Sequence, residues 1–440
     1  MPSPVASPRP ASHDVGRARW AATLAFATNG ALLGALVPHY PQAKAAFGLD
    51  AGAFGLLVIA LALGAAATGS LAAPVLRRAG SRRVVLVGTA GLAVLTAAAG
   101  VVLDVADAAP GAPWAGAVGV FGGLLLVAGA GDAIVDTAQN AQGLRVQTLL
   151  ARPVLTSMHA GWSLGAAVGA GLGALSVGAG LPAGVHLALN GAACLGLLLA
   201  VHRRFLPDAD AASASATSAS PSVSGQASPE RAAARHDGAT PRPSRAGAWP
   251  VLAPVAVIAM AGFGVEEFGN AWTALYLQSE RGLAPAPAGL GAATLLGAQF
   301  LGRLAGDRVL HVLGRRRTLT ASLVVVVAGL GLALAASSLP AVFAGLALAG
   351  LGCAVVVPTA YALGDEIPGL PAQTGLAVVS WLMRLAGIGL SPLVGLLATG
   401  VPLLAALLAF PVLAALGLAC TLLIDRPARP RPGAPSPAAR

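Results

Sequence analysis

The sequence predicts an all-α membrane protein with twelve transmembrane helices in two pseudo-symmetric six-helix bundles. Hydrophobic residues make up 56% of its 440 residues and charged residues only 10%, whereas soluble domains are about 25% charged. Apolar runs long enough to cross a bilayer, roughly 20 residues each, recur along the chain. Two similar basic segments, Gly69–Arg83 and Gly302–Arg317, each follow such a run, one in either half of the chain. This recurrence indicates a duplicated architecture.

The apolar runs are predicted to be helices because lipid leaves no partner for the backbone groups of an open sheet. The 57 glycines suit close helix packing, since small residues let backbones approach. The predicted helices lie near residues 18–40, 52–76, 83–103, 114–137, 153–178, 183–203, 249–277, 285–307, 318–337, 340–363, 372–398 and 402–424.

The net charge of +10 indicates membrane orientation rather than a nucleic-acid partner. If the N-terminus is cytoplasmic, nearly all arginines fall in cytoplasmic segments, and the outer loops keep only Lys44 and Arg281. The positive-inside rule then places both termini in the cytoplasm of a multi-pass protein of the cell (plasma or inner) membrane. The lipid bilayer is therefore an expected partner, and nucleic acid is not.

The domain organisation follows from the same map. Residues 1–16 are predicted to be a disordered tail, 17–204 the N-terminal six-helix bundle and 249–425 the C-terminal bundle. Residues 205–248 are rich in Ala, Ser and Pro without apolar periodicity, which predicts a disordered cytoplasmic linker. Residues 426–440 are predicted to be a second disordered tail.

The two halves can be aligned through their fourth and tenth helices. Residues 128–138 read AGAGDAIVDTA and residues 349–359 read AGLGCAVVVPT, so that Gly129 matches Gly350. Asp132 and Asp136 match Cys353 and Val357. One half of a shared scaffold has therefore acquired two acids that the other lacks.

These features resemble the major facilitator superfamily of secondary transporters over nearly the whole chain. The superfamily's loop motif is written G-x-L-A-D-R-x-G-R-R. In the second half it is matched, in a lengthened form, by Gly302, Leu304, Asp307, Arg308, Gly314, Arg315 and Arg316. In the first half it is matched by Gly69, Leu71, Gly80, Arg82 and Arg83, with Ala73 and Pro74 where the acid is expected. The resemblance implies that these loops brace helices during gating.

A closer resemblance is to the fucose–proton-symporter-like branch and its uncharacterised bacterial relatives. It rests on GDAIVDTAQNAQ (131–142), RPVLTSMHAGWSLGA (152–166) and NAWTALYL (270–277). The fifth helix lacks the Gly-Pro motif typical of drug–proton antiporters in this superfamily, which disfavours efflux.

Acids at membrane depth are costly and mark ion or substrate paths. Asp132 and Asp136 share a helix face at a spacing of four, so one of them should hold a proton more readily. They are therefore proton-coupling candidates, and Asn140 extends their face as a candidate for substrate binding. The alternative for Asp136 is a hydrated position at the cytoplasmic mouth, paired with Arg145 or Arg152.

A second polar group lies in the seventh helix, where Glu266 and Glu267 are adjacent. Successive helical residues point about 100° apart, so one of the two is expected to face a cavity. Glu266 is a proton-coupling candidate. Glu267, Asn270 and Trp272 are substrate-binding candidates, since an acid, an amide and an aromatic ring suit a sugar or polyol. The alternative is an outer-end acid in water.

Arg384 and Trp381 lie near the middle of the eleventh helix. An arginine there either pairs with a buried acid, Asp132 being the partner considered, or receives an anionic substrate. The remaining substrate-binding candidates are Asn29, His159, Trp162 and Gln299. Hydrogen bonding within the protein would explain His159, Asn29 and Gln299 as well.

The sequence thus predicts a secondary active transporter working by alternating access, and not an enzyme. The hypothesis is proton-coupled uptake of a small polar solute such as a sugar, and the alternative is proton-driven efflux of a small organic compound or drug. We expect a monomer whose partners are a small-molecule substrate and protons. The spacing of His, Cys, Asp and Glu suggests no metal site, and no cofactor is expected.

Overall fold

The computed structural model describes residues 12–49, 51–108, 116–207, 245–283, 285–367 and 370–424, and this part of the chain is helical with no strand. Eleven of its helices are long and apolar enough to cross a membrane. The twelfth, α13 (Pro285–Leu313), is 29 residues long but carries Arg303, Asp307 and Arg308 in its second half. Residues 1–11 and 426–440 of the predicted tails, and residues 208–244 of the predicted linker, lie outside the described residues.

The first half contains six membrane helices, two of which have short companions. They are α1 (Ser12–Leu36) with α2 (Tyr40–Ala46), α3 (Ala51–Thr68) continued by α4 (Ala72–Ala79), α5 (Ser81–Asp107), α6 (Ala117–Leu150), α7 (Leu155–Gly178) and α8 (Ala183–Val201). Helix α1 begins at Ser12, inside the stretch 1–16 for which a tail was predicted. Gly80 has φ +81° at the turn before α5, a conformation that glycine adopts without strain.

The second half repeats this plan with more interruptions. Its helices are α11 (Arg245–Glu267), which continues through a π-helical turn (Phe268–Trp272) into α12 (Thr273–Ser279), then α13, α14 (Arg315–Ala335), α15 (Leu339–Cys353) with α16 (Val356–Asp365), α17 (Thr374–Leu397), and α18 (Leu403–Leu407) with α19 (Ala409–Cys420). The loop-motif segment after Gly302 is helical as far as Leu313, and Gly314 then turns the chain with φ +76°.

The pseudo-symmetry of the halves is visible in one repeated helix crossing. A Cβ added to Gly129 in α6 would lie 1.8 Å from the carbonyl oxygen of Leu61 in α3. A Cβ added to Gly350 in α15 would lie 2.0 Å from the carbonyl oxygen of Leu295 in α13. Both crossings bring backbones together at a glycine, as small-residue contacts between membrane helices do. The alignment of Gly129 with Gly350 therefore corresponds to equivalent contacts.

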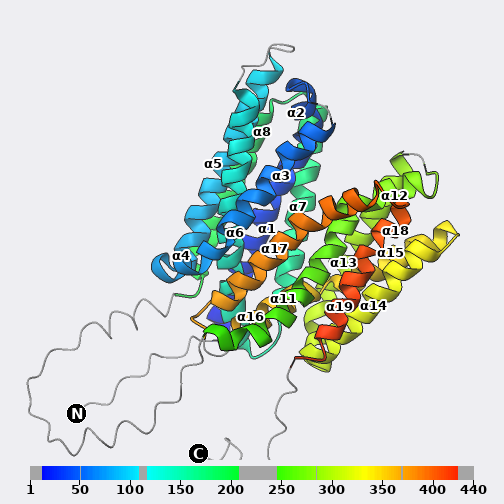
Figure 1. Ribbon diagram of the computed structural model, residues 1–440. Helices are drawn as coiled ribbons and strands as arrows, with labels where there is room; N and C mark the ends of the chain where they lie inside the picture. Colours follow the sequence, from blue (N-terminus) through cyan, green and yellow to red (C-terminus); the bar gives the residue numbers. More distant parts are fainter. Residues whose placement is uncertain are drawn as a thin grey trace, which may run out of the picture.

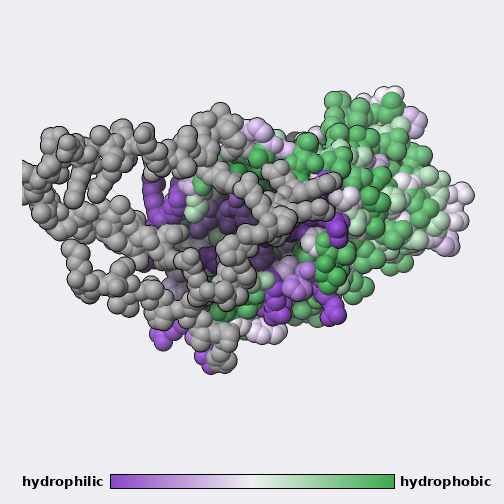
Figure 2. All heavy atoms as spheres, turned by 90° about the horizontal axis from the view of Figure 1, so that it is seen from below, coloured by the Kyte–Doolittle hydropathy of each residue, from purple (hydrophilic) through white to green (hydrophobic). Residues whose placement is uncertain are grey.

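The two bundles meet at one end of the molecule and diverge towards the other (Figure 1). We call the meeting end the base; it carries the turns at Gly80 and Gly314, with α4 and α16 nearby. The opposite end carries α2 and α12. Seen from the base, hydrophilic residues gather on the end face and hydrophobic residues cover the flank (Figure 2). This distribution matches a protein whose flank contacts lipid.

Candidate functional site

Arg384 in α17 bridges two carboxylates of the other half. Its Nη1 lies 3.4 Å from Asp132 Oδ2 and its Nη2 lies 3.1 Å from Asp136 Oδ2. The side chain of Asp132 is only 8% exposed and that of Arg384 20%. Helix geometry aligns the two acids, because residues four apart on α6 lie one above the other. A single guanidinium therefore contacts one buried and one half-buried carboxyl group across the junction between the bundles.

This pairing differs from the alternative considered for Asp136. The sequence allowed a partner at the cytoplasmic mouth, Arg145 or Arg152. Asp136 instead pairs with Arg384, while Arg145 donates to the backbone carbonyl of Pro207. The sequence interpretation named only Asp132 as a partner of Arg384, whereas in the structure both Asp132 and Asp136 contact Arg384.

Asp132 is held by an oriented chain of hydrogen bonds from α1 and α7. Trp162 Nε1 donates to Asn29 Oδ1 at 2.9 Å, and Asn29 Nδ2 donates to Asp132 Oδ1 at 3.0 Å. Asn29 is 2% exposed, so both ends of its amide are used within the protein. The arrangement fixes the carboxylate in place and leaves its second oxygen for Arg384.

Asp136 is held in a similar way from its own helix. Asn140 Nδ2 donates to Asp136 Oδ1 at 3.0 Å, and His159 Nε2 lies 3.0 Å from Asn140 Oδ1. Since the amide oxygen can only accept, this geometry puts a hydrogen on His159 Nε2. The ring of His159 contacts Phe26 and Tyr361, with centroids 4.9 and 6.2 Å away. This environment favours a hydrogen-bonded structural role for His159.

We call these seven residues the Asp132 network. They are Asn29, Asp132, Asp136, Asn140, His159, Trp162 and Arg384. All seven are candidates from the sequence, and the structure brings them together from α1, α6, α7 and α17.

A second charged cluster is centred on Glu266 in α11. Glu266 Oε1 accepts from Gln299 Nε2 and from Arg303 Nη2, both at 2.5 Å. Arg303 Nη1 donates to Ser163 Oγ at 2.7 Å, which carries the cluster across to α7 of the first half. We call Glu266, Gln299, Arg303 and Ser163 the Glu266 network. It neighbours the Asp132 network along α7, where Trp162 and Ser163 are adjacent.

Arg303 is not among the candidates that the sequence interpretation names. It is 5% exposed and packed inside the protein. It directly follows Gly302, the first residue of the loop motif, and was grouped with that basic loop. The signal was nevertheless present, because the predicted helix over 285–307 already contained it.

The other candidates of the seventh helix have separate partners. Trp272 Nε1 donates to Ser391 Oγ at 3.0 Å, and Ser391 in turn donates to Glu267. Glu266 and Glu267 thus contact different neighbours, and Trp272 is the last residue of the π-helical turn that follows them. Such turns are frequent at functional sites. Asn270 is exposed and donates to the backbone carbonyl of Glu266, so it does not contact the Glu266 carboxylate.

Trp381 lies where the halves touch and not in either network. Its indole Nε1 donates to the carbonyl oxygen of Ala66 in α3 at 2.6 Å. A Cβ on Gly69 would lie 2.9 Å from its ring, so this glycine of the loop motif makes room for the indole. The geometry of Trp381 is that of a contact between bundles.

The loop motif of the second half reaches across to the first. Asp307 accepts hydrogen bonds from the backbone N–H groups of Thr156 at 3.0 Å and Ser157 at 3.1 Å, in the first turn of α7. A carboxylate there satisfies amides that lack a helical partner and complements the helix dipole. Arg315 forms an ion pair with Glu366. Arg308 is exposed, and Gly302 packs closely on Ala354.

The first-half motif makes a weaker bridge. Arg77 Nη1 donates to Thr374 Oγ1 at 3.1 Å, at the first residue of α17. Arg82 and Arg83 lie in the first turn of α5 and line a cavity at the base. The motif therefore braces the two halves unequally, because only the second-half motif supplies a carboxylate.

Among the described residues, no group of three His, Cys, Asp or Glu side chains could hold a metal ion. Cys194, Cys353 and Cys420 are free thiols. The chemical groups available in the two networks are carboxylates, guanidinium groups, amides, the His159 imidazole, the Trp162 indole and the Ser163 hydroxyl.

Comparisons with known proteins agree with the fold and the sequence resemblance. No family model matches the chain. An uncharacterised MFS-type transporter of Yersinia pestis is 28% identical over 360 residues, which cover 81% of this chain and 83% of that protein. An uncharacterised transporter of Sinorhizobium fredii is 28% identical over 361 residues, covering 81% and 84%.

Solved structures of major facilitator transporters superpose on nearly the whole chain. FucP in its outward conformation has a TM-score of 0.67 at 15% identity, covering 93% of this chain and 99% of FucP. A bacterial homologue of ferroportin in an outward-facing state has a TM-score of 0.63 at 15% identity, covering 93% and 97%. The human organic anion transporter MFSD10 has a TM-score of 0.61 at 16% identity, covering 93% and 99%.

The chain is therefore a multi-pass membrane protein with the major facilitator fold. In sequence it resembles MFS-type transporters, and these relatives are carriers rather than enzymes. The predicted fold class and the resemblance to the superfamily are confirmed, and the fucose symporter FucP is among its structural neighbours.

Proposed function

We propose that this protein is a proton-coupled uptake transporter for a small polar solute, such as a sugar, and that it works by alternating access. The observation that carries the proposal is the bridge from Arg384 to Asp132 and Asp136, an ion pair between the two bundles. We further propose that the base faces the cytoplasm of the cell membrane, because the arginine-rich segments lie there, and that the protein acts as a monomer.

The charges in this bridge support proton coupling. While both carboxylates are ionised, they compensate Arg384 and hold the bundles together. Two carboxylates and one guanidinium sum to a net charge of −1, so protonation of one acid makes the group neutral but replaces one charge-assisted contact to Arg384 by a weaker contact to a neutral carboxyl group. The bridge therefore weakens when a proton arrives, and the base can open. A proton taken up from the end where the bundles diverge would thus be released on the side of the base.

A polar substrate is supported by donors that the protein leaves unused. Arg384 Nε and Arg303 Nε are buried and have no acceptor among the described residues. Such groups need a partner, which a substrate hydroxyl or a water molecule can supply. Trp162 and Trp272 offer aromatic faces near the two networks, suited to a sugar ring. One structural neighbour is named as a fucose:proton symporter and another as an organic anion transporter, so the fold itself does not select a substrate.

The test begins with a thermal-shift screen of the purified protein against sugars, organic acids and drugs, which supplies a substrate. Proteoliposomes then measure accumulation under a pH gradient for the natural protein and for Asp132→Asn. The amide keeps the volume of the side chain but cannot titrate. We expect the variant to lose uphill accumulation while retaining exchange of substrate across the membrane.

Asp107→Asn is the matched control, because this acid contacts Gln42 at the end opposite the base, outside both networks. It should accumulate substrate as the natural protein does. Unchanged pH-driven accumulation by Asp132→Asn would contradict the proposal. If inward proton flow drives export of the substrate, the proposal of uptake would be wrong and proton-driven efflux would take its place.

A further inference from the structure

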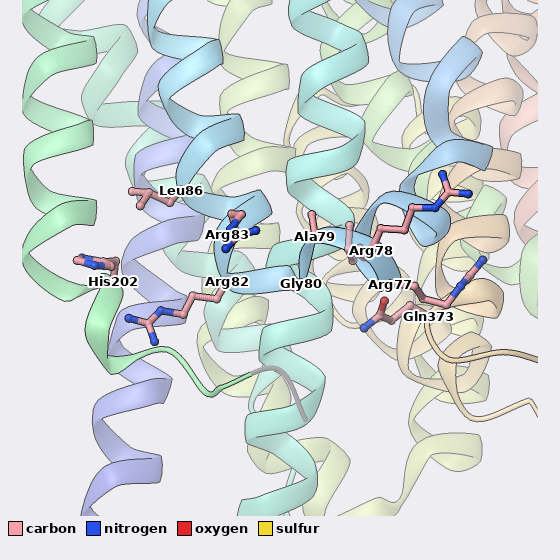
Figure 3. Close-up of a pocket in the computed structure, with 10 residues that line it drawn as sticks. Arg77, Arg78, Ala79, Gly80, Arg82, Arg83, Leu86, His202 and Gln373 are labelled. Carbon is pink, nitrogen blue, oxygen red and sulfur yellow. The ribbon is translucent and has the colours of Figure 1, made fainter. Parts of the chain in front are cut away.

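A basic cavity of about 450 Å³ lies at the base of the first half, beside the turn between α4 and α5. Figure 3 shows its lining, with Arg82 near His202 at one side and Arg77 near Gln373 at the other. Four arginines, His202 and the second-half residue Gln373 contribute polar groups; the arginines are Arg77, Arg78, Arg82 and Arg83. The cavity thus adjoins both bundles, at the start of α17.

The positive charge of this cavity has no acidic counterpart among the described residues. None of the described lining residues is an acid. Arg77 donates to a threonine hydroxyl, and none of the ion pairs between described residues involves Arg78, Arg82 or Arg83. Concentrated guanidinium groups without a counter-charge repel one another, so an anion in the cavity would lower the free energy of this region.

Two helix starts add to the positive potential. Helix α5 begins after Gly80 and α17 begins after Gln373, and neither has a side-chain cap. The N–H groups of a first helical turn lack partners and carry partial positive charge. Gln373 Oε1 is buried without a donor, and rotation of this amide would turn its NH₂ group toward an anion.

The equivalent place in the other half contains a negative charge. There, Asp307 accepts from the first backbone amides of α7. The sequence alignment puts Pro74 at the corresponding position of the first half, and α17 is the counterpart of α7. The first turn of α17 therefore lacks the carboxylate that its counterpart receives.

We infer that this cavity binds a phosphate group, either the head group of an anionic phospholipid or free inorganic phosphate, which supplies the missing negative charge. Guanidinium groups match phosphate oxygens in a bidentate geometry. Basic pockets between membrane helices suit anionic lipid head groups, and Leu76 and Leu86 give this one an apolar side. The predicted linker 205–248 is a poor rival, because its four acids, Asp208, Asp210, Glu230 and Asp237, are balanced by four arginines.

The test uses the full chain purified in a neutral detergent and measures its melting temperature. One arm titrates phosphatidylglycerol against phosphatidylcholine, and the other titrates inorganic phosphate against chloride at equal ionic strength. The double variant Arg82→Gln/Arg83→Gln should bind the stabilising anion with at least about tenfold lower affinity, as expected for the loss of charge-assisted hydrogen bonds. Lipid retained in native mass spectrometry gives a second measurement if the variant is unstable.

Arg316→Gln/Arg317→Gln is the matched control. It removes two arginines from the equivalent helix start after Gly314 without touching the cavity. Saturable stabilisation by phosphatidylglycerol alone, sensitive only to the first variant, supports a lipid site; the same pattern with phosphate supports a free-phosphate site. Equal loss in both variants, or no saturable stabilisation by either anion, overturns the inference. A variant in which the four linker acids are replaced by amides provides a further test. If its melting temperature falls by the same amount without added anion, the linker supplies the negative charge and the inference is overturned. No substrate is needed, so the result is independent of the proposed transport activity.

Discussion

The carboxylate of Asp307, in α13 of the second half, accepts a hydrogen bond from the backbone amide of Thr156, at the first turn of α7 in the first half. The donor–acceptor distance is 3.0 Å, and the neighbouring amide of Ser157 binds the other oxygen. A helix of one bundle is thus capped by an acid of the other. The cap exists only while the base is closed, so it stabilises this conformation relative to one with an open base.

Asp307→Asn should shift the conformational equilibrium toward an open base. The amide is neutral and a poorer partner for the helix start, and loss of a cap costs about 1 kcal/mol. That corresponds to a roughly fivefold change in the ratio of the two states. Distances between spin labels on the two bundles at the base would measure it. Asp104→Asn is the control, because Asp104 caps α8 within one half, through Ala183 and Gly184. It should lower stability without opening the base, and equal opening in both variants would refute the argument.

Arg384→Gln should move the pH optimum of transport upward. Without the guanidinium, Asp132 and Asp136 repel each other, so protonation of one is favoured at higher pH. A pH profile of uptake in proteoliposomes measures the shift. Adding Asp132→Asn should cause little further loss, because the two residues act in one bridge. Arg281→Gln is the control, since Arg281 binds Tyr276 and a carbonyl of α14 far from the base. An unmoved optimum with additive defects would reject the bridge.

Glu266→Gln should destabilise the protein more than Glu267→Gln. The first change leaves Arg303 buried without a compensating charge, whereas Glu267 accepts a hydrogen bond from the Ser391 hydroxyl and forms no ion pair among the described residues. Because the Glu266 side chain is 22% exposed, we expect about 1–3 kcal/mol, below the cost for a fully buried pair. Thermal unfolding in detergent is the measurement. The double variant Glu266→Gln/Arg303→Gln should be more stable than Glu266→Gln alone, because no buried charge is left unpaired. Equal losses of stability in Glu266→Gln and Glu267→Gln would contradict the pairing.

Gly129→Ala should lower the melting temperature strongly, although alanine normally favours a helix by about 1 kcal/mol. Its Cβ would lie 1.8 Å from the Leu61 carbonyl oxygen, which forces α6 and α3 apart. Gly131→Ala is the control two residues away, where a Cβ would meet only Leu92 at an ordinary 3.7 Å. This second variant should be neutral or slightly stabilising. Equal melting temperatures would show that the helices are not in close contact at Gly129.

The sequence contained the candidate networks but not their pairings. Charged residues are rare in apolar helices, so Asp132, Asp136 and Arg384 can be recognised from the sequence alone. Their pairing joins residues 252 and 248 positions apart, and only helix packing brings them within reach. Arg303 was missed for the opposite reason. It lies inside the loop motif, and its burial depends on the partners that α7 and α11 supply once the helices are packed together.

The amino-acid sequence was sufficient to predict the membrane class, the approximate helices and the repeat that relates the two halves. Those properties depend on local hydropathy and on short motifs, which act within one helix length. The tertiary structure alone decided that the bundles close at the base, that Asp307 caps α7 and that Arg384 bridges two acids. Such contacts join distant helices, and their free energy depends on relative positions that only the packing of the whole molecule sets.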